Sequence, residues 1–490
     1  MLRLDERLGA IADLVLEAVL GRETPCAADV GCDHGFLTAG LLERCPSLTM
    51  IASDVSAPSL QKARELLASL GLASRAALRV ADGLAAINGP VDAIVIAGMG
   101  AQTILKIVAE GRARIGNAAL IVQANVDLPM LRTGLAAQGL VVEREIYTRA
   151  AGRHYVTMLA RAGEADMPDE RAALLGMAAG GMRGEGQRSY FVWQRGVRVR
   201  EMERVAPLQT ERAKERIRLS SRELTWISEA LGMKNCTVSD VERLVGGIAP
   251  YELAEEWDNV GLLVGHADAQ VTRALVALDL SMNVIAEART LGAQMIVTHH
   301  PIMFSARKRL TDADREGRLM LALAEAGIAH IAAHTNLDSA PGGVNDTLMA
   351  AMGAANVRGE GFVRAGDLPE GTTLGALAQR ARTRLKAEVR LYGAPDTAVH
   401  VLGCCSGADG GEVALARALG ADCFITGEIR HHEALDAVDA GVCVLEAGHF
   451  ETENPVCEVL RTALQNAADA LQYNLTVFCS KGNPFGRLNG

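Results

Sequence analysis

The stretch DVGCDHG (residues 29–35) begins at the end of a short apolar segment, 26–30, and precedes a helical pattern over 37–44. A buried strand that ends in a glycine-rich turn before a helix is typical of sites for nucleotide-like ligands, because glycine lets the backbone approach the ligand closely. The loop lacks the third glycine of a phosphate cradle and carries the carboxylates of Asp29 and Asp33. It therefore predicts a cationic, phosphate-free cofactor such as S-adenosylmethionine.

The residues around this loop extend the same prediction. Helical and strand-like segments alternate over residues 1–160, with strands expected at 49–53, 77–80, 93–96, 119–122, 141–146 and 155–160. This order favours an α/β fold with a mostly parallel sheet, as in a Rossmann-like class I methyltransferase. Asp54 ends the second strand and Asp82 follows the third, where carboxylates can accept hydrogen bonds from ribose hydroxyls and an adenine amine. The predicted cofactor-binding residues are Asp29, Gly31, Gly35, Asp54, Asp82, Gly83 and Gly98. The alternative is that these are ordinary turn residues.

Composition narrows the class of protein. A chain of 490 residues exceeds the size of one core, so two or three domains are expected. No apolar run reaches the roughly 18 residues that a membrane span needs, and the first residues do not resemble a signal peptide. The ten cysteines form no CxxC pair, which favours reduced thiols. We therefore expect a cytoplasmic protein that does not bind membranes.

Aromatic residues make up only 3% of the chain, so stacking surfaces for single-stranded nucleic acid are scarce.

Charge divides the chain into unlike halves. Residues 1–232 carry 28 Lys and Arg against 27 Asp and Glu, whereas residues 233–490 carry 21 against 32. The acidic half is a poor platform for nucleic acid but can recruit cations. Between 151 and 223 basic side chains exceed acidic ones by 14 to 10, as a polyanionic substrate would require.

Residues 169–229 lack strand patterns and read as two or three helices, with a glycine-rich break at 180–186. We expect three parts: a methyltransferase domain (1–160), a helical arm that binds tRNA or forms a coiled coil (161–232), and a second α/β domain (233–490). The basic side chains of the arm that would contact tRNA are Arg183, Arg188, Arg195, Arg198, Arg200, Arg204, Arg212 and Arg216.

The first 230 residues resemble the TrmK family, the tRNA (adenine-22-N1)-methyltransferases. The matching segments are DVGCDHGFL (29–37), ASDVS (52–56), ADGL (81–84), IAGMGAQTI (96–104) and IVQAN (121–125). The chain departs from the family pattern at GFLT (35–38), Ala101 and Ala124. The resemblance implies transfer of a methyl group from S-adenosylmethionine to N1 of an adenine in tRNA.

Adenine N1 has an in-plane lone pair and needs no prior deprotonation, so positioning can carry most of this catalysis. The methylated base is cationic, and a nearby carboxylate would stabilise it. We expect Asp33 to have this role, with His34, Gln123 and Asn125 as contacts to the adenine. For His34 the alternative is a hydrogen-bonded turn residue.

Three short motifs in the second half combine histidines with carboxylates: THHP (298–301) at the end of an expected strand, HTNLD (334–338) and HFETE (449–453). His449 and Glu453 are four residues apart, so they share one face of a helical turn. Such side chains suit Zn, Mn, Fe or similar ions, and a bridging carboxylate suits two of them.

Together these motifs resemble the GTP cyclohydrolase 1 type 2 homologues, a Nif-like dinuclear-metal family. The resemblance covers residues 233–490 and includes AEEWDNVGLLVG (254–265), SGADGGE (406–412) and TGEIRHHE (426–433). It implies two divalent metal ions and a ring-shaped homo-oligomer such as a hexamer; residues 358–400 leave no room for the family's long insert. The implied ligands are His299, His300, Asp338, His449 and Glu453, with Glu453 as the bridge and His334 and His432 in the same cavity.

The sequence leaves the activity of the second half open. Two metal ions with room for water favour hydrolysis of a nucleotide or another small molecule, and the family name implies opening of the GTP ring. The alternative is a metal-binding scaffold or metal chaperone without turnover. For the first half, one alternative is transfer to a small molecule, which would not need the basic arm. The other is a domain that binds the cofactor and tRNA but serves mainly to deliver a partner.

Overall fold

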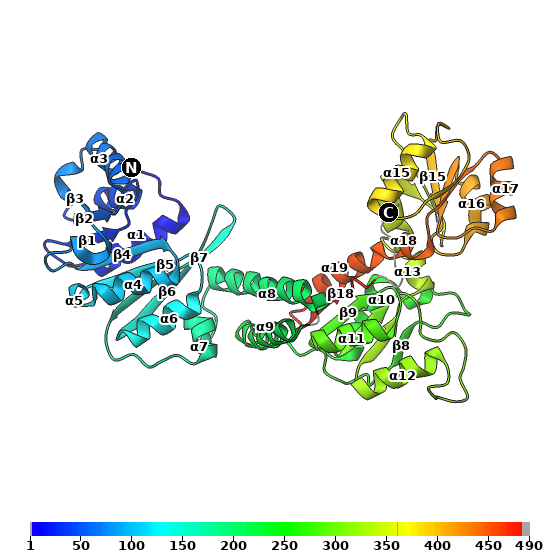
Figure 1. Cartoon of the computed structure of the whole chain (residues 1–490), viewed down its shortest axis with the longest axis horizontal. Helices are drawn as coiled ribbons and strands as arrows, with labels where there is room; N and C mark the ends of the chain where they lie inside the picture. The colour runs from blue at the N-terminus through cyan, green and yellow to red at the C-terminus, as the bar shows by residue number, and fades with distance from the viewer. Residues whose placement is uncertain (1, 209, 360, 483–490) are drawn as a thin grey trace. The chain divides into compact units, whose positions relative to one another are not determined.

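The computed structural model describes residues 2–208, 210–359 and 361–482. Spatial contacts group the chain into two units, shown in Figure 1. The first contains Met1–Arg198 and Ser220–Gly232, and the second contains Val199–Leu219 and Met233–Gly490. The helical segment therefore contributes to both units. The domain boundaries expected from the sequence remain predictions.

The first unit is built on a seven-stranded sheet with the order β3-β2-β1-β4-β5-β7-β6. Its first five strands are parallel, and β7 runs antiparallel to both β5 and β6. The strands are β1 (Cys26–Val30), β2 (Thr49–Asp54), β3 (Ala76–Val80), β4 (Ala93–Met99), β5 (Ala119–Ala124), β6 (Leu140–Ala150) and β7 (Arg153–Ala162). The α/β fold expected from the sequence is confirmed, but β6 and β7 extend well beyond the expected 141–146 and 155–160.

Helices cover both faces of this sheet, as a parallel sheet requires. Apolar side chains of α1 and α2 form one core with β1, β4 and β5, while α4 and α6 pack together on the other face. Asp5 and Ser56 cap α1 and α3 by accepting backbone N–H groups of the first turn. The helices are α1 (Glu6–Ala18), α2 (Phe36–Arg44), α3 (Ala57–Ser69), α4 (Ala101–Glu110), α5 (Arg112–Ile115), α6 (Leu128–Ala137), α7 (Glu170–Leu175), α8 (Glu185–Val205) and α9 (Glu211–Ala230).

The second unit contains two sheets. The first has the order β18-β9-β10-β11-β8, in which only β8 is antiparallel to its neighbour. Helices α10 and α19 share a core with this sheet, and α11 and α12 contact its strands as well. The elements are β8 (Gly261–Val264), β9 (Arg273–Ala277), β10 (Met295–Thr298), β11 (Ala329–Ala332), β18 (Thr476–Cys479), α10 (Val238–Ile248), α11 (Met282–Leu291), α12 (Arg315–Ala326), α13 (Thr335–Ser339) and α19 (Pro455–Ala470).

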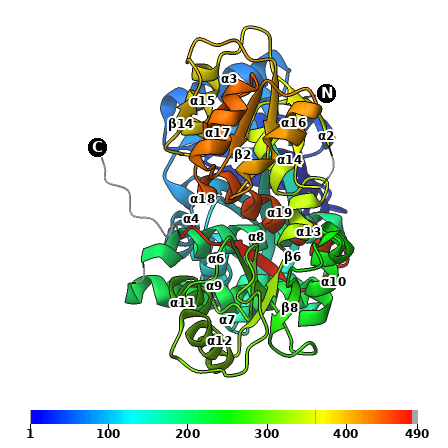
Figure 2. The same cartoon turned by 90° about the vertical axis from the view of Figure 1, so that its right-hand side faces the viewer.

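The second sheet has the order β12-β13-β15-β16-β17-β14. Alternate side chains of β16 face opposite cores: Cys423 and Ile425 pack with α14 and α15, whereas Phe424 packs with α16 and α17. Figure 2 shows these helices around the sheet. The elements are β12 (Ala355–Arg358), β13 (Arg364–Asp367), β14 (Arg390–Tyr392), β15 (Val401–Cys404), β16 (Cys423–Thr426), β17 (Cys443–Glu446), α14 (Val344–Met352), α15 (Leu374–Arg384), α16 (Val413–Ala418), α17 (His431–Asp439) and α18 (His449–Glu453). Residues 358–400 thus supply strands of this sheet.

Candidate functional sites

The loop after β1 turns tightly against neighbouring elements. The N–H of Gly31 donates to the carbonyl of Ser53 at 2.8 Å, which ties the loop to the end of β2. Gly35 has a φ of 75°, and a Cβ there would lie 2.8 Å from the Cβ of Ala63. The positive φ and the close approach explain why this position favours glycine. The loop is therefore held in one shape before any ligand binds.

Carboxylates lie in a row along the rim of this sheet. The Asp54 carboxylate accepts the N–H of Asp33 at 3.0 Å and the N–H of Ser56 at 2.8 Å. Asp82 is exposed just after β3. Because β3, β2 and β1 are neighbours and parallel, their carboxyl ends bring Asp82, Asp54 and Asp33 to the same edge. Each carboxylate oxygen of Asp54 keeps a second lone pair, so this residue can still accept hydroxyl groups.

Asp29 lies beneath the loop and is only 4% exposed. The Thr38 hydroxyl donates to its Oδ2 at 2.7 Å. Burial raises the pKa of Asp29 to about 6, against the effect of the Thr38 hydrogen bond. Because Asp29 is buried beneath the loop and bound to Thr38, it helps to fix the conformation of the loop. A direct contact between Asp29 and a cofactor remains a prediction.

The three expected catalytic residues lie in two groups. The Asp33 side chain is 67% exposed and lies 3.2 Å from Nδ1 of His34, whose Nε2 is 3.0 Å from the Lys62 ammonium. Asn125, just after β5, donates to the carbonyl of Gly98 at 2.8 Å.

Gln123 lies beside this second group, at the end of β5. It donates to Asn125 at 3.2 Å and accepts a hydrogen bond from Arg7 at 3.0 Å. Asn125 and Gln123 thus form a fixed polar patch beside the end of β4, where Gly98 has a φ of 79°.

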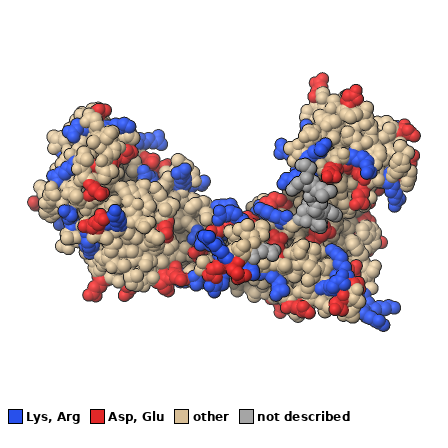
Figure 3. All heavy atoms as spheres, in the orientation of Figure 1, with Lys and Arg blue, Asp and Glu red and all other residues tan. Residues whose placement is uncertain are grey.

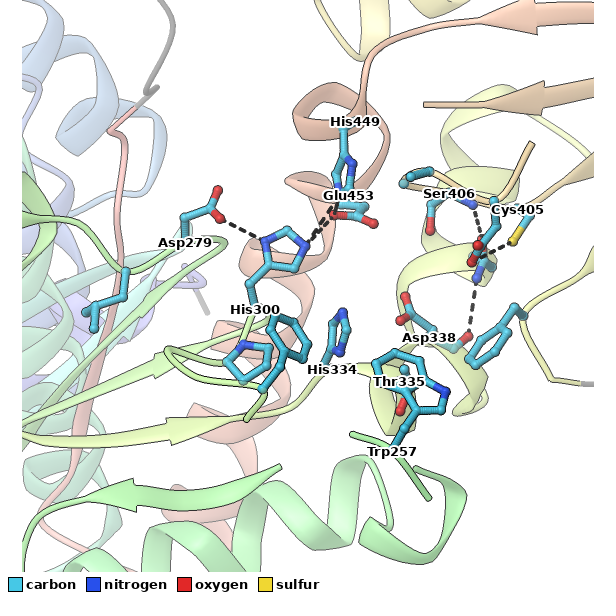
Figure 4. A pocket seen from close by; sticks show the side chains of 18 of the residues that line it. Trp257, Asp279, His300, His334, Thr335, Asp338, Cys405, Ser406, His449 and Glu453 are labelled. Atoms are coloured by element: carbon cyan, nitrogen blue, oxygen red, sulfur yellow. Dashed lines mark hydrogen bonds and ion pairs between the residues drawn. The ribbon is translucent and has the colours of Figure 1, made fainter. Parts of the chain in front are cut away.

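The second candidate site lies where strand ends of both sheets of the second unit meet (Figure 4). His299 and His300 follow β10, His334 follows β11, and Asp338 is in α13. His449 and Glu453 begin and end the short helix α18, after β17. Three groups of these six side chains have ligand atoms within 4.8 Å of one another. The structure thus brings together all five metal ligands expected from the sequence, as well as His334.

Glu453 is at the centre of the cluster. Its Oε2 lies 3.1 Å from Nε2 of His300, 3.0 Å from Nε2 of His449 and 4.0 Å from Nε2 of His299. The Asp338 carboxylate is 3.5 Å from Nε2 of His299. A carboxylate surrounded by several imidazoles in this way can bridge two ions.

Hydrogen bonds fix the orientation of three imidazoles. Nδ1 of His299 donates to the carbonyl of Ala333 at 2.9 Å. Nδ1 of His300 is 2.8 Å from Asp279, and Nδ1 of His334 is 3.0 Å from Asp258. In each ring Nε2 is directed at the cluster, which is the usual arrangement of metal-binding histidines. Nε2 of His299 and Oδ1 of Asp338 are buried and have no hydrogen-bond partner. The donor set therefore fits divalent transition metals.

The pKa values in the cluster reflect burial and close charges. Burial lowers the pKa of His299 to about 3, so its ring is neutral and Nε2 carries a lone pair. Burial opposes charge on His300, but its hydrogen bonds to Asp279 and Glu453 raise its pKa to about 10. Burial and the Glu453 charge raise the pKa of Asp338 well above its usual range. Without a cation, the cluster must hold protons to balance its charge.

A cavity of about 460 Å³ opens onto the cluster. Trp257 and Phe304 line it with their rings 6.3 Å apart, and the Phe304 ring is 5.6 Å from that of His334. Gly407 also lines the cavity, and a Cβ there would come within 2.4 Å of Oε1 of Glu453. The site can therefore accept a small molecule beside the histidines.

The sequence prediction missed two residues and misplaced one. Asp279 and Asp258 orient His300 and His334, and Asp258 belongs to the AEEWDNVGLLVG segment that carried the resemblance. For Asp279 the available signal was its place just after a buried strand, β9. The expectation for His432 is wrong: it is exposed on α17 and does not line this cavity.

Four of the eight arginines expected to contact tRNA have a partner in the protein or are buried. Arg198 binds Glu223 at 2.7 Å, Arg216 binds Glu201 at 2.7 Å, and Arg188 donates to the carbonyl of Leu231. Arg195 is only 8% exposed. In Figure 3 basic and acidic side chains lie side by side over α8 and α9. Arg216 is the most accessible of the four, with half of its side chain exposed.

None of the helices in the described ranges is long and apolar enough to cross a bilayer. The sequence profile described as a methyltransferase domain matches residues 4–158. The profile of the Duf34/NIF3 (NGG1p interacting factor 3) family matches residues 236–484.

Individual relatives and solved structures each match about half of the chain. A GTP cyclohydrolase 1 type 2 homolog of Clostridium acetobutylicum is 33% identical over 257 residues, which cover 50% of this chain and 96% of that protein. A crystal structure of a Staphylococcus aureus protein has a TM-score of 0.50 and 28% identity, over 52% of this chain and 99% of its own. The crystal structure of the B. subtilis M1A22 tRNA methyltransferase TrmK has a TM-score of 0.42 and 23% identity, over 47% of this chain and all of its own. The chain belongs to the Duf34/NIF3 family and joins that region to an amino-terminal methyltransferase domain.

Proposed function

We propose that the amino-terminal domain transfers a methyl group from S-adenosylmethionine to N1 of an adenine in tRNA. The row of carboxylates at the ends of β1, β2 and β3 carries the proposal. Asp54 would accept the ribose hydroxyls of the cofactor, and Asp82 would accept its adenine amine. The bound cofactor would supply an electrophilic methyl group. The glycine loop and the buried Asp29 would keep its binding site in shape.

The residues at the rim have separate roles in this proposal. Asn125 is held by the carbonyl of Gly98 and by Gln123, so its position is fixed before the substrate arrives. Such fixed amides can orient the target adenine at no further cost in entropy. The exposed Asp33 carboxylate would stabilise the positive charge that develops on the methylated base.

The direct test is methylation of unmodified tRNA by the purified full-length protein, followed by mass spectrometry of the nucleosides. We expect 1-methyladenosine, and its loss from the tRNA of cells that lack the protein. Asp33→Asn should retain affinity for S-adenosylmethionine and lose turnover. Cofactor binding without transfer to any tRNA would contradict the proposal and favour a small-molecule substrate or a delivery role.

We propose that the second unit binds two divalent metal ions through His299, His300, Asp338, His449 and Glu453, and that it hydrolyses a small molecule. The convergence of imidazole Nε2 atoms on the Glu453 carboxylate carries this proposal. Bound ions would supply Lewis acidity to the reaction. Asp279 and Asp258 would hold the imidazoles in place, and the adjoining cavity would hold the substrate.

Metal analysis of the purified protein tests the first part, with about two ions per chain expected. Nucleotides, phosphate esters and cyclic amides, offered with Zn, Mn or Fe, test the second part. If the protein binds metal and turns over none of these with any metal, the site is a scaffold or metal chaperone.

We also propose that the protein is cytoplasmic, which cell fractionation can test. We propose that it forms a homo-oligomer, such as a hexamer formed through the second unit, which light scattering can test.

A further inference from the structure

The β6–β7 hairpin extends past the sheet of the first unit at the edge where the cofactor loop lies. The last residue of β5 that pairs with β7 is Gln123, opposite Thr157. Beyond this point only β6 and β7 pair, up to Ala150 opposite Arg153. Four residue pairs at 3.4 Å per residue extend the hairpin by roughly 14 Å. Figure 1 shows it as the cyan loop beside the β7 label.

The base of the hairpin is joined to the polar patch at the rim. Arg7 donates to Gln123 at 3.0 Å and lies over the ring of Tyr155, 5.7 Å from its centroid. Tyr155 pairs with Thr148 and lies two residues from Thr157, the partner of Gln123. A substrate that places its reacting base near Asn125 would therefore extend along this hairpin.

Aromatic side chains gather on one face of the hairpin, although aromatic residues are only 3% of the chain. The His154 ring stacks on Trp193 of α8 at 5.2 Å with an angle of 27°, and Tyr190 lies 5.7 Å from Trp193. The close approach of Gly186 fixes α8 here, because a Cβ would lie 2.6 Å from the Tyr147 carbonyl oxygen. Trp193 is nevertheless 40% exposed. Burial and the charge of Arg149 lower the pKa of His154, so the stacked pair is uncharged at neutral pH.

The tip of the hairpin carries two arginines. Arg149 pairs with His154 across the strands, so it flanks the aromatic face, and Arg153 is directed to the opposite face. Both are exposed, and within the described residues neither forms an ion pair. They differ in this respect from the paired arginines of the helical arm. An unpaired cation on the face of an exposed aromatic ring, with a second at the tip of the same hairpin, is typical of surfaces that bind unpaired nucleic acid.

We propose that the hairpin tip and Trp193 form an RNA-contact surface, in which an unpaired base stacks on Trp193 and Arg149 and Arg153 bind the neighbouring phosphates. This inference rests on the proposed tRNA methylation and names the part of the protein that holds the tRNA. Stacking selects an unpaired region of the RNA, since a base inside a helix has no free face. The target adenine would then be in or next to an unpaired segment.

The test measures binding of unmodified tRNA transcripts to the full-length protein at several salt concentrations. Trp193→Ala should weaken binding about 5- to 100-fold, and Trp193→Phe should retain most of the affinity. The double variant Arg149→Gln/Arg153→Gln should lower the slope of log affinity against log salt by about 2. Arg114→Gln is the matched control, because Arg114 is exposed just before β5, at the opposite edge of the sheet.

Affinity for S-adenosylmethionine should be unchanged in all variants, because none of these residues lies in the cofactor loop, and it shows that each variant is folded. If the wild-type protein methylates tRNA and the variants bind it as the wild type does, the inference is wrong and the proposed function stands. If the variants lose tRNA binding but the wild type transfers no methyl group, the surface stands and the proposed reaction is wrong.

Discussion

Nε2 of His299 and Oδ1 of Asp338 face each other at 3.5 Å, both buried and both without a hydrogen-bond partner. Nδ1 of His299 already donates to a backbone carbonyl, so its neutral ring offers a lone pair to a carboxylate that also offers lone pairs. Two acceptors at this distance repel each other unless a proton or a metal ion lies between them, and a metal ion bound by both would replace the proton that the raised pKa of Asp338 favours. We predict that His299→Ala removes at least one of the two proposed ions.

Elemental analysis of the purified variant gives the metal content. Thermal unfolding gives a second measurement, since a ligand at 100 times its Kd stabilises a protein by about 2.7 kcal/mol. The His299→Ala variant should lose most of the stabilisation that added metal gives to the wild type. The control is His266→Ala, which changes an exposed histidine outside the cluster. Equal metal content in both variants would contradict the assignment of His299.

Asp279→Asn tests the orientation of His300. The Asp279 carboxylate accepts Nδ1–H of His300 at 2.8 Å. If the asparagine presents its NH₂ group to Nδ1 instead, the His300 ring must turn or change its tautomer. Changes of this kind cost about 10- to 100-fold in metal affinity. Competition with a chelator measures this affinity. Asp436→Asn on the exposed side of α17 should bind metal as the wild type does; an equal loss in both variants would indicate a general effect of charge.

Gly407→Ala should disrupt the same cluster by steric conflict. The new methyl group would lie 2.4 Å from Oε1 of Glu453, and the φ of 66° disfavours alanine. We expect lost metal and a protein that still folds, measured by metal content and circular dichroism. Gly411→Ala is a matched control in the same SGADGGE segment, because its nearest neighbour would be 3.7 Å away. Normal metal binding by Gly407→Ala would show that α18 moves easily.

The sequence predicted the parts of this protein that depend on local patterns. Buried strands alternate with amphipathic helices, and THHP and DVGCDHG mark strand ends, so both rims could be located. The pairs Asp258–His334 and Asp279–His300 join residues 76 and 21 positions apart, and no local pattern encodes such contacts. The outer parts of β6 and β7 escaped prediction because residues such as Arg149 and Arg153 lie outside the core and carry no apolar alternation. His432 was misplaced because a histidine pair alone does not show which face of a helix is buried.

Asp29→Asn should change how stability depends on pH. The pKa of Asp29 rises from 3.8 to about 6 on folding because the group is buried, so the folded state binds this proton more tightly than the unfolded state. The contribution of Asp29 to the free energy of unfolding therefore falls as pH rises from about 4 to 6, by about 3 kcal/mol in total. The variant has no carboxyl group at this position, so its stability should not show this decrease. Hydrogen exchange of β1 amides between pH 4 and 7, corrected for intrinsic rates, measures it; parallel pH profiles would contradict the prediction.

Arg132→Met should destabilise the first unit more than any surface change. Arg132 binds Glu145 at 2.6 Å, with side chains 5% and 0% exposed, and donates to the carbonyls of Ala173 and Leu174 in α7. Removal of one partner leaves a buried charge without compensation and costs about 3–5 kcal/mol. Urea unfolding measures the loss, followed by tryptophan fluorescence in a Trp193→Phe/Trp257→Phe background that leaves Trp226 as the one tryptophan.

The double variant Arg132→Met/Glu145→Gln separates charge from packing. It removes the uncompensated carboxylate, while the amide oxygen of the new side chain can still accept the Tyr147 hydroxyl, which now donates to Glu145 at 2.6 Å. It should therefore be more stable than Arg132→Met alone. Both variants lack the hydrogen bonds that Arg132 donates to the α7 carbonyls. If the double variant is as unstable as the single one, the hydrogen bonds to the α7 carbonyls, rather than the ion pair, hold this region together.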